Sequence, residues 1–347
     1  MPTNFKIRLT EDYDAKTWNA YVERHHDSGP YHLWEWREAV HKAYGHTAYY
    51  LIAQKKDCYE PVGLLPLHLI KSPLAKGELV SLPFCDYGGP LADTLKVALL
   101  LCEHAKDLAD SMKTKLEIRC NQRLTVSPVL SSFGNKVRML LDLPGSSDTL
   151  FKQFKSKLRS QIRRPIKEGF YSKLGGLELV QDFYTVFRIN MRDLGSPVHS
   201  LKWFKALAAF YDQKIKIGVV YKEEIPVAGG VILLHNETVS IPWASSLRSY
   251  NHLSPNMLLY WSFLEYAADN GYKKFDFGRS SPDSGTFRFK KQWGAVPHPV
   301  FWYKNSDSEG KIPADGKMRE KAEKFWRKLP ISLATFLGPR IRKYISL

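Results

Sequence analysis

The order of apolar and polar segments strongly restricts how this chain can fold. Two apolar segments joined by a polar turn, a long amphipathic helix and a closing apolar strand occur in residues 49–120 and again in residues 215–277. Strands that alternate with long helices are typical of α/β proteins with mixed or parallel sheets. The repeat is one of architecture and not of sequence, so it predicts two related α/β domains.

The length of the chain is consistent with that division. At about 100–200 residues per domain, 347 residues provide for two domains that each bury a core. We expect the first domain over residues 1–145 and the second over residues 146–305, followed by a linker and a helical tail in residues 306–347. No apolar run reaches the ~20 residues that span a bilayer, and the N-terminus lacks the apolar core of a secretory signal. We therefore expect a cytoplasmic protein.

Positive charge is concentrated in two segments. The chain has 51 Lys and Arg residues against 35 Asp and Glu residues, a formal net charge of +16. Residues 150–175 and residues 311–347 each carry a net charge of +7, which together account for 14 of the 16 excess charges. This concentration favours an anionic partner such as a phosphate, an RNA or an acidic membrane surface. Solvated basic helices without a partner are the alternative.

Each basic segment leaves two interpretations open. A helix expected over residues 147–168 presents its charges to the phosphates of a tRNA acceptor stem, or merely solvates one face of a packed helix. The tail, residues 316–347, packs through an apolar face on the rest of the protein, or it contacts an anionic membrane with Trp326 and Tyr344 at the interface. The apolar face of the tail is indicated by residues at steps of four, three and four: Met318, Ala322, Phe325 and Leu329.

A helix start in the second domain indicates an anion site. Ser254 and Pro255 suit the N-cap and the first position of a helix expected over residues 254–270. Because a helix N-terminus presents free N–H groups and a partial positive charge, it can bind a phosphate or a carboxylate.

The segment after this helix contains the candidate catalytic groups. Asp276 and Arg279 lie at the end of a strand expected over residues 274–277, where open α/β sheets position ligands, although a structural Asp276–Arg279 pair explains them equally well. Alternation in the next segment predicts a strand with Arg288 and Lys290 on one face, flanked by aromatic side chains. Two cations so placed suit an anionic ligand or a developing oxyanion.

Several common catalytic motifs are missing from the sequence. It contains no GxSxG nucleophile elbow, no HExxH zinc motif and no GxxxxGK[ST] phosphate loop. The adjacent His25 and His26 lie in a polar stretch that we interpret as surface. The sequence therefore indicates no metal site.

These segments resemble the FemAB-like branch of the GNAT-related superfamily, in particular the FemAB-related proteins of bacterial exosortase/PEP-CTERM and exopolysaccharide systems. The best-known relatives transfer amino acids from aminoacyl-tRNA to peptidoglycan precursors. The resemblance implies two tandem GNAT-like domains with a substrate cleft between them and C-terminal helices that pack back on the first domain. It extends from about residue 5 to the tail and rests on VGLLPLHLIKSPL, SLPFCDYGGP, RSQIRRPIKEG, NMRDLGSPVHS, IPWASSLRSYNHLSPN, LSPNMLLYWSFLEYAADNGYKKFDFGRS and FRFKKQWG.

The resemblance also implies roles for individual residues. Phe289 and Lys290 match an FxFK motif at the acyl-transfer site. Arg192 matches an arginine that helps to hold substrate phosphate in the relatives. Trp243 matches an aromatic residue that lines their substrate channel. In the first domain, the loop that begins at Tyr87 faces the cleft.

The residues themselves and the family resemblance both fit one mechanism, the attack of an amine on an activated acyl donor. Lys290 stabilises the tetrahedral oxyanion, and Asp276 acts as base or orients an arginine. No bound cofactor is expected, and aminoacyl-tRNA or acyl-CoA serves as co-substrate. The acceptor is an anionic glycan or glycopeptide precursor of peptidoglycan or exopolysaccharide type, with its phosphate or carboxylate held by residues that include Arg37, Arg192, Arg279 and Arg288.

Two departures from the relatives keep other functions open. The chain lacks the coiled-coil arm that some Fem proteins use near tRNA, and it lacks the Q/R-x-x-G-x-G/A loop of ordinary GNAT acetyltransferases. The alternatives are an acyl-CoA-dependent N-acyltransferase and a non-catalytic glycan- or membrane-associated scaffold.

Overall fold

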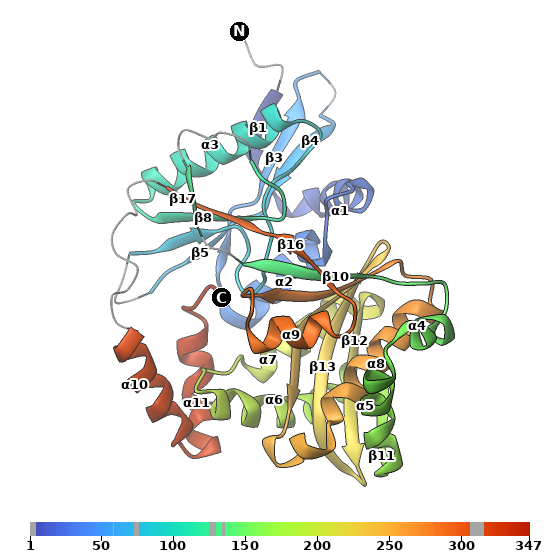
Figure 1. Cartoon of the computed structure of the whole chain (residues 1–347). Helices are drawn as coiled ribbons and strands as arrows, with labels where there is room; N and C mark the ends of the chain where they lie inside the picture. The colour runs from blue at the N-terminus through green and yellow to red at the C-terminus, as the bar shows by residue number, and fades with distance from the viewer. Residues whose placement is uncertain (1–4, 58, 73–75, 125–129, 134–135, 306–315) are drawn as a thin grey trace. The chain divides into compact units, whose positions relative to one another are not determined.

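The computed structural model describes residues 5–57, 59–72, 76–124, 130–133, 136–305 and 316–347. The chain divides into two compact units (Figure 1). Unit 1 comprises Met1–Val137, Pro299–Ile312 and Lys343–Leu347, and unit 2 comprises Arg138–His298 and Pro313–Arg342. Unit 2 begins earlier than the expected boundary after residue 145, because strand β10 pairs within the sheet of unit 2.

Unit 1 contains two sheets with strand orders β1-β3-β4-β7 and β2-β5-β6-β8-β17-β9. Strands β6 and β8 are parallel and are connected through α3, whose N-terminus is capped by the side chain of Thr94. The elements of unit 1 are β1 (Phe5–Leu9), α1 (Ala15–Arg24), α2 (Trp34–Tyr44), β2 (Thr47–Ala48), β3 (Leu51–Lys55), β4 (Pro61–Leu65), β5 (His68–Ile70), β6 (Glu78–Val80), β7 (Leu91–Ala92), α3 (Leu95–Ser111), β8 (Lys115–Cys120), β9 (Leu130–Phe133) and β17 (Phe301–Asn305).

Unit 2 is built on one seven-stranded sheet with the order β11-β12-β13-β14-β15-β10-β16. Strands β11 to β14 form an antiparallel series, and β14 and β15 are parallel. The elements of unit 2 are β10 (Val137–Asp142), α4 (Ser147–Gln153), α5 (Ser156–Lys167), β11 (Phe170–Gly175), α6 (Val180–Leu194), α7 (Leu201–Tyr211), β12 (Ile215–Lys222), β13 (Ile225–His235), β14 (Thr238–Ser246), α8 (Pro255–Asp269), β15 (Lys274–Ser280), α9 (Gly285–Lys291), β16 (Val296–Pro299), α10 (Gly316–Arg327) and α11 (Ile331–Arg342).

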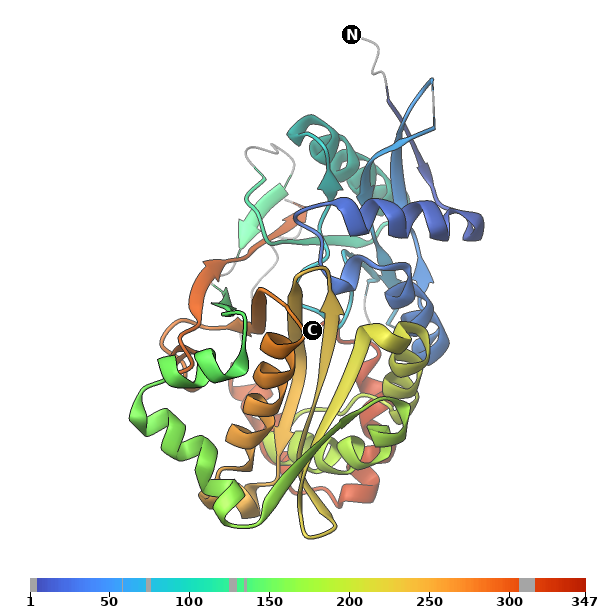
Figure 2. The ribbon, with the colours of Figure 1, turned by 90° about the vertical axis from the view of Figure 1, so that its right-hand side faces the viewer.

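Helices cover both faces of this sheet. Figure 2 shows the orange α8 on one face and the yellow-green α7 on the other. Helices α4 and α5 contact α8 and extend its layer, whereas α6 contacts α7. The helix expected over residues 147–168 is divided at Phe154 and Lys155, both of which are extended, because the Phe154 ring is buried against Trp261 and Trp293.

Two paired glycines allow α8 to approach the sheet closely. Gly218 in β12 lies opposite Gly230 in β13, and the buried ring of Phe263 from α8 rests on both. A Cβ atom added at Gly218 would lie 2.6 Å from the Phe263 ring, well inside van der Waals contact. Since the sheet and the helix pack at high density, neither can move away without loss of other contacts.

We expect Gly218→Ala to lower the free energy of unfolding of unit 2 by about 1–3 kcal/mol through overpacking against Phe263. Urea denaturation followed by tryptophan fluorescence measures this change. The control is Gly145→Ala, since a Cβ atom at that position meets nothing within 4 Å. Equal stability of the two variants would contradict the packing argument.

The C-terminal helices were expected to pack on the first domain, but they pack on α6 of unit 2. Both α10 and α11 contact α6, and a Cβ atom at Gly338 would lie 2.8 Å from Val198. Only Lys343–Leu347 belong to unit 1, where the amide of Phe84 donates to the carbonyl of Ser346 over 2.6 Å. In the part of the chain that the structure describes, no helix is both long and apolar enough to cross a membrane.

The apolar face predicted for the tail is also partly wrong. Phe325, which was expected to pack, is 65% exposed, whereas Trp326 is buried next to Leu329 and Ala334. The helix is therefore rotated by about one residue relative to the predicted face.

Candidate functional site

The parallel strands β14 and β15 separate after a short ladder. They pair at three positions, of which the last joins Ser240 to Asp276. Beyond this pair both strands continue, β14 to Ser246 along β13 and β15 to Ser280. Two diverging strands create an opening in the sheet with free edges on both sides.

A pocket of about 200 Å³ lies beside this opening. The strand wall is Ala244, Ser245 and Ser246, and the amide of Asn190 from α6 donates to the Ser245 hydroxyl over 3.0 Å. The helical wall consists of Asn256, Leu259 and Tyr260 from α8 and Phe289 from α9. The rings of Tyr260 and Phe289 meet edge to face at 4.9 Å.

The N-terminus of α8 opens toward this pocket. Pro255 occupies the first turn as predicted, and Asn256 in the same turn lines the pocket. Ser254 occupies the N-cap position but has a left-handed backbone, and its side chain forms no capping hydrogen bond. The first-turn N–H groups of this 15-residue helix thus lack the side-chain cap that the sequence predicted and suit an anionic ligand.

The strand predicted for residues 285–294 is wrong. Residues Gly285–Lys291 form the helix α9, and Ser284 caps it by accepting a hydrogen bond from the amide of Phe287. The N-cap favours a helix at this position, and it outweighed the alternation of side chains that predicted a strand. Arg288 and Lys290 consequently differ in environment: Arg288 is exposed and donates to the carbonyl of Asp283, whereas Lys290 is buried.

Lys290 connects α9 to the end of β15. Its Nζ atom donates to the carbonyl of Gly278 over 3.0 Å and to the carbonyl of Arg279 over 2.8 Å, and the residue is 8% exposed. A buried ammonium group on two carbonyls fixes the course of the strand edge. It also places a full positive charge next to residues that form the opening.

Asp276 is bound by an arginine that the sequence did not suggest. Its carboxylate accepts hydrogen bonds from Nη2 of Arg138 over 2.7 Å, from Nε of Arg138 over 3.1 Å and from the amide of Gly278 over 2.8 Å. Asp276 is 2% exposed, and Arg138 comes from the neighbouring strand β10. These bonds support a role in fixing β15 more than a role as a base.

The remaining residues predicted in the second domain lie at varying distances from the pocket. Phe289 lines it, and Arg279 lies half-buried near the end of β15. Arg192 donates to the carboxylate of Asp193 over 2.6 Å and to the carbonyl of Leu329 over 3.2 Å, so it binds the C-terminal segment. The ring of Trp243 packs edge-on against Phe204 at 5.2 Å and is not one of the residues that line the pocket.

Two further predicted residues lie in unit 1. Tyr87 is 2% exposed and meets Tyr31 edge to face at 5.1 Å. Arg37 lies in a separate pocket of about 640 Å³, where its guanidinium covers the ring of Trp34 at 4.4 Å. The same guanidinium pairs with Asp12 and Glu38.

A loop partly covers the equivalent opening in unit 1. Strands β6 and β8 are also parallel and pair at three positions. The loop after β6 then follows β8: the amide of Gly88 donates to the carbonyl of Arg119, and the amide of Arg119 donates to the Ser81 hydroxyl. The buried guanidinium of Arg119 binds Glu117 and carbonyls of the same loop. A pocket of about 140 Å³ remains at the end of β8 and the start of α3, compared with about 200 Å³ beside the parallel pair of unit 2.

The histidine pair lies next to Asp27. His25, His26 and Asp27 have ligand atoms within 4.8 Å of one another. His25 is buried, contrary to the prediction, and both of its ring nitrogens are engaged, with the carbonyl of Ala92 and the amide of Asp27. A metal ion would have to displace one of these bonds.

The sequence of this region matches a known family. Residues 153–291 match the family described as an acetyltransferase (GNAT) domain, and this range includes every wall of the pocket. This part of the chain is a GNAT-type acyltransferase domain. No curated protein is similar enough in sequence to count as a match.

Solved structures show the same fold over both units. FemX aligns with a TM-score of 0.68 at 16% identity, covering 86% of this chain and 96% of FemX. The structure of L-PGS from Bacillus licheniformis aligns with a TM-score of 0.55 at 13% identity over 96% of this chain and 99% of that one. A tandem GNAT protein of the clavulanic acid biosynthesis pathway aligns with a TM-score of 0.53 at 10% identity over 86% and 98%. The predicted fold of two tandem GNAT-like domains is confirmed, and it is the fold of FemX. The relation to the proteins of exosortase/PEP-CTERM systems stays a prediction.

Sequence reasoning missed Arg138, Asn190, Ser245 and Tyr260. Arg138 lies 138 positions before its partner Asp276, and no local pattern signals such a pair. Tyr260 had a weak signal, since it lies one turn after the predicted anion-binding helix start. Burial raises the pKa of the Tyr260 hydroxyl well above its ordinary value, so this hydroxyl keeps its proton at neutral and alkaline pH.

We expect Lys290→Met to reduce transfer by about 100-fold or more, the usual cost of losing one oxyanion donor. The carbonyls of Gly278 and Arg279 also lose a donor, which lowers the free energy of unfolding by about 1–3 kcal/mol. Single-turnover rates and thermal unfolding separate the two effects. Lys274→Met removes the same charge at the exposed start of β15 and should leave both quantities near wild type.

The Arg138–Asp276 pair should contribute to stability as a unit. Asp276→Asn or Arg138→Gln leaves a buried charge without its partner, at a cost of about 3–5 kcal/mol in the free energy of unfolding. The double variant Arg138→Gln/Asp276→Asn should cost clearly less than the sum of the single variants. Urea denaturation of all four proteins tests this, and strictly additive changes would show that the two side chains do not act on each other.

Proposed function

We propose that this protein is a FemAB-like transferase that moves an activated acyl or aminoacyl group onto an amine of a cell-envelope precursor. The acceptor is of peptidoglycan or exopolysaccharide type, an anionic glycan or glycopeptide. The observation that carries the proposal is the open pocket where β14 and β15 separate. The first turn of α8 and Phe289 line this pocket, and Lys290 next to Phe289 holds the end of β15.

The chemistry requires little beyond positioning and charge stabilisation, because an ester or thioester is already activated. The acceptor nitrogen attacks the carbonyl carbon, a C–N bond forms, and the carbonyl π electrons move to oxygen. The positive charge of Lys290 stabilises this oxyanion. The C–O or C–S bond then breaks and Tyr260 gives a proton to the leaving oxygen or sulfur. The nitrogen loses its extra proton to solvent, and a proton from solvent restores the Tyr260 hydroxyl.

The acceptor phosphate requires cations, which the sequence analysis assigned to arginines. In unit 2, Arg279 lies near the opening and remains the best-supported of these. Arg192 is engaged with Asp193 and the C-terminal segment, and Arg37 with two carboxylates, so either residue would have to exchange a partner to hold phosphate.

The donor is aminoacyl-tRNA or acyl-CoA. The basic face of α5 supports the first, since Arg163, Arg164 and Lys167 are exposed and no carboxylate in the described residues forms an ion pair with them. The match to a GNAT domain supports the second, since such domains use acyl-CoA. A scaffold without catalysis is less well supported, because the pocket and Lys290 are both present.

The proposal also includes a peripheral contact between residues 316–347 and the anionic inner face of the cell membrane. Phe325 is 65% exposed and Phe336 is 57% exposed, and the guanidinium of Arg340 covers the Phe336 ring at 3.8 Å. Exposed aromatic residues among Lys and Arg residues suit the boundary between lipid headgroups and acyl chains.

Transfer assays with aminoacyl-tRNA and acyl-CoA donors test the proposal, with UDP-linked muropeptide and amino-sugar acceptors. One donor should give product with the wild type, and Tyr260→Phe should lower kcat by about 100-fold while KM changes little. Binding of acceptor and donor without any product would support the scaffold. A tRNA affinity that falls steeply with salt would assign α5 to the donor.

A further inference from the structure

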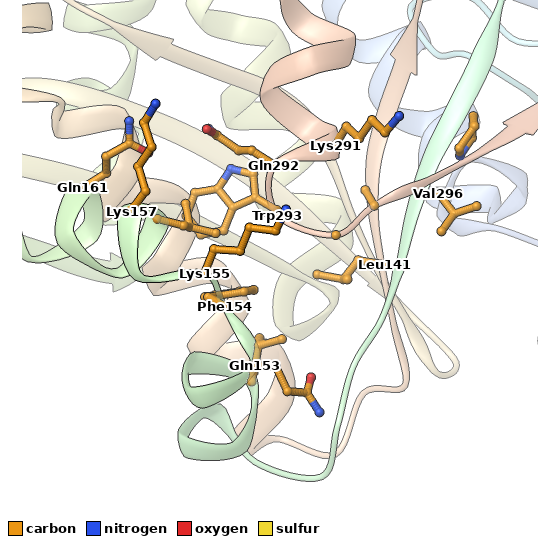
Figure 3. Close-up of a pocket in the computed structure, with 15 residues that line it drawn as sticks. Leu141, Gln153, Phe154, Lys155, Lys157, Gln161, Lys291, Gln292, Trp293 and Val296 are labelled. Carbon is orange, nitrogen blue, oxygen red and sulfur yellow. The ribbon is translucent and has the colours of Figure 1, made fainter.

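A second pocket in unit 2, larger than the transfer pocket, has no role in the transfer reaction. Its volume is about 660 Å³, within the range of small-molecule sites. Most of its lining comes from two stretches, residues 153–161 around the start of α5 and residues 291–297 from the end of α9 onward, and Figure 3 also shows Leu141 of β10. The apolar part of the lining is Leu141, Leu150, Phe154, Leu158, Trp293, Ala295, Val296 and Pro297.

The polar part of the lining has one sign of charge. Lys155, Lys157 and Lys291 contribute to the pocket, all three are exposed, and no Asp or Glu is among its lining residues. Within the described part of the chain, no carboxylate forms an ion pair with these lysines. Three like charges around an apolar cavity repel one another and are stabilised by an anionic group.

A buried donor gives an independent indication of a ligand. The indole N–H of Trp293 has no hydrogen-bond partner in the structure, although the residue is only 1% exposed. Leaving such a group unpaired costs about 1–3 kcal/mol, so a ligand acceptor atom that reaches it would be favourable. The Trp293 ring packs edge to face on the ring of Phe154, with centroids 5.6 Å apart.

We propose that this pocket binds a hydrocarbon chain that carries a phosphate group. The chain lies against Phe154, Leu158 and Val296, and the phosphate is held by the lysines at the rim. The pocket shares an aromatic cluster with the transfer site, since Trp293 lies 6.2 Å from Tyr260 and 6.3 Å from Phe289, both of which line the transfer pocket. A lipid-linked substrate bound here would therefore be retained next to the transfer site, a deduction that rests on the proposed function.

Calorimetric titration with dodecyl phosphate below its micellar concentration tests the proposal on the full chain. One molecule should bind, at least tenfold more tightly than inorganic phosphate or dodecyl maltoside, which lack the chain or the charge. Lys155→Gln/Lys157→Gln/Lys291→Gln should weaken dodecyl phosphate binding at least tenfold. Ala295→Trp, which fills the pocket, should abolish it, with circular dichroism to confirm folding.

The matched control also removes three positive charges, but from residues of α5 that do not line this pocket. Arg159→Gln/Arg163→Gln/Arg164→Gln should leave the affinity for dodecyl phosphate within twofold of wild type. An equal loss in this control would mean that the basic helix attracts anions without a site and would overturn the proposal. Binding of dodecyl phosphate no tighter than inorganic phosphate would overturn it too.

A hydrocarbon chain with a phosphate group could belong to a membrane lipid or to a soluble phosphate ester. A second experiment distinguishes these two ligands. Sedimentation with phosphatidylglycerol vesicles should depend on the pocket variants if the ligand is a membrane lipid. Binding of dodecyl phosphate with no effect of the pocket variants on sedimentation would assign the site to a soluble acyl or prenyl phosphate. None of these measurements involves transfer, so a failure here leaves the transferase proposal standing.

Discussion

The separation of β14 from β15 is the constraint on which the functional part of unit 2 depends. Parallel strands that part after three residue pairs need other partners for the strand that is released. On its far side β15 neighbours β10, which supplies Arg138 for the buried Asp276, and its end is held by the ammonium group of Lys290. The opening is thus kept by charged groups with fixed partners, as a transfer site that must be preorganised requires.

The two units use the same architecture with different results. In unit 1 the loop after β6 runs along β8, and the buried Arg119 binds that loop and Ser346. In unit 2 the segment after β14 forms a short 3-10 helix, Arg248–Leu253, before α8 begins at Pro255. The loop along β8 therefore narrows the end of the parallel pair in unit 1, whereas β14 and β15 leave a pocket of about 200 Å³ beside theirs.

The distribution of charge separates three tasks within unit 2. Lys290 is buried and serves the strand edge, the lysines near Trp293 surround an apolar cavity, and the arginines of α5 lie on an exposed face. These three groups of positively charged side chains therefore differ in how far solvent reaches them. Since the strength of an ionic contact depends on that access, each environment suits a different anion.

The sequence by itself determined the alternation of elements, and with it the α/β class, the two domains and most helix and strand positions in unit 2. Those features follow from local patterns of 2.0 and 3.6 residues. Through the family resemblance it also singled out Phe289, which lines the pocket, and Lys290, which binds the end of β15. Only the tertiary structure decided that residues 285–291 are helical, that Phe154 breaks a helix, and that Arg138 binds Asp276. Each of these depends on a cap, a buried ring or a strand neighbour far away in the chain, and such contacts leave no periodic trace in the sequence.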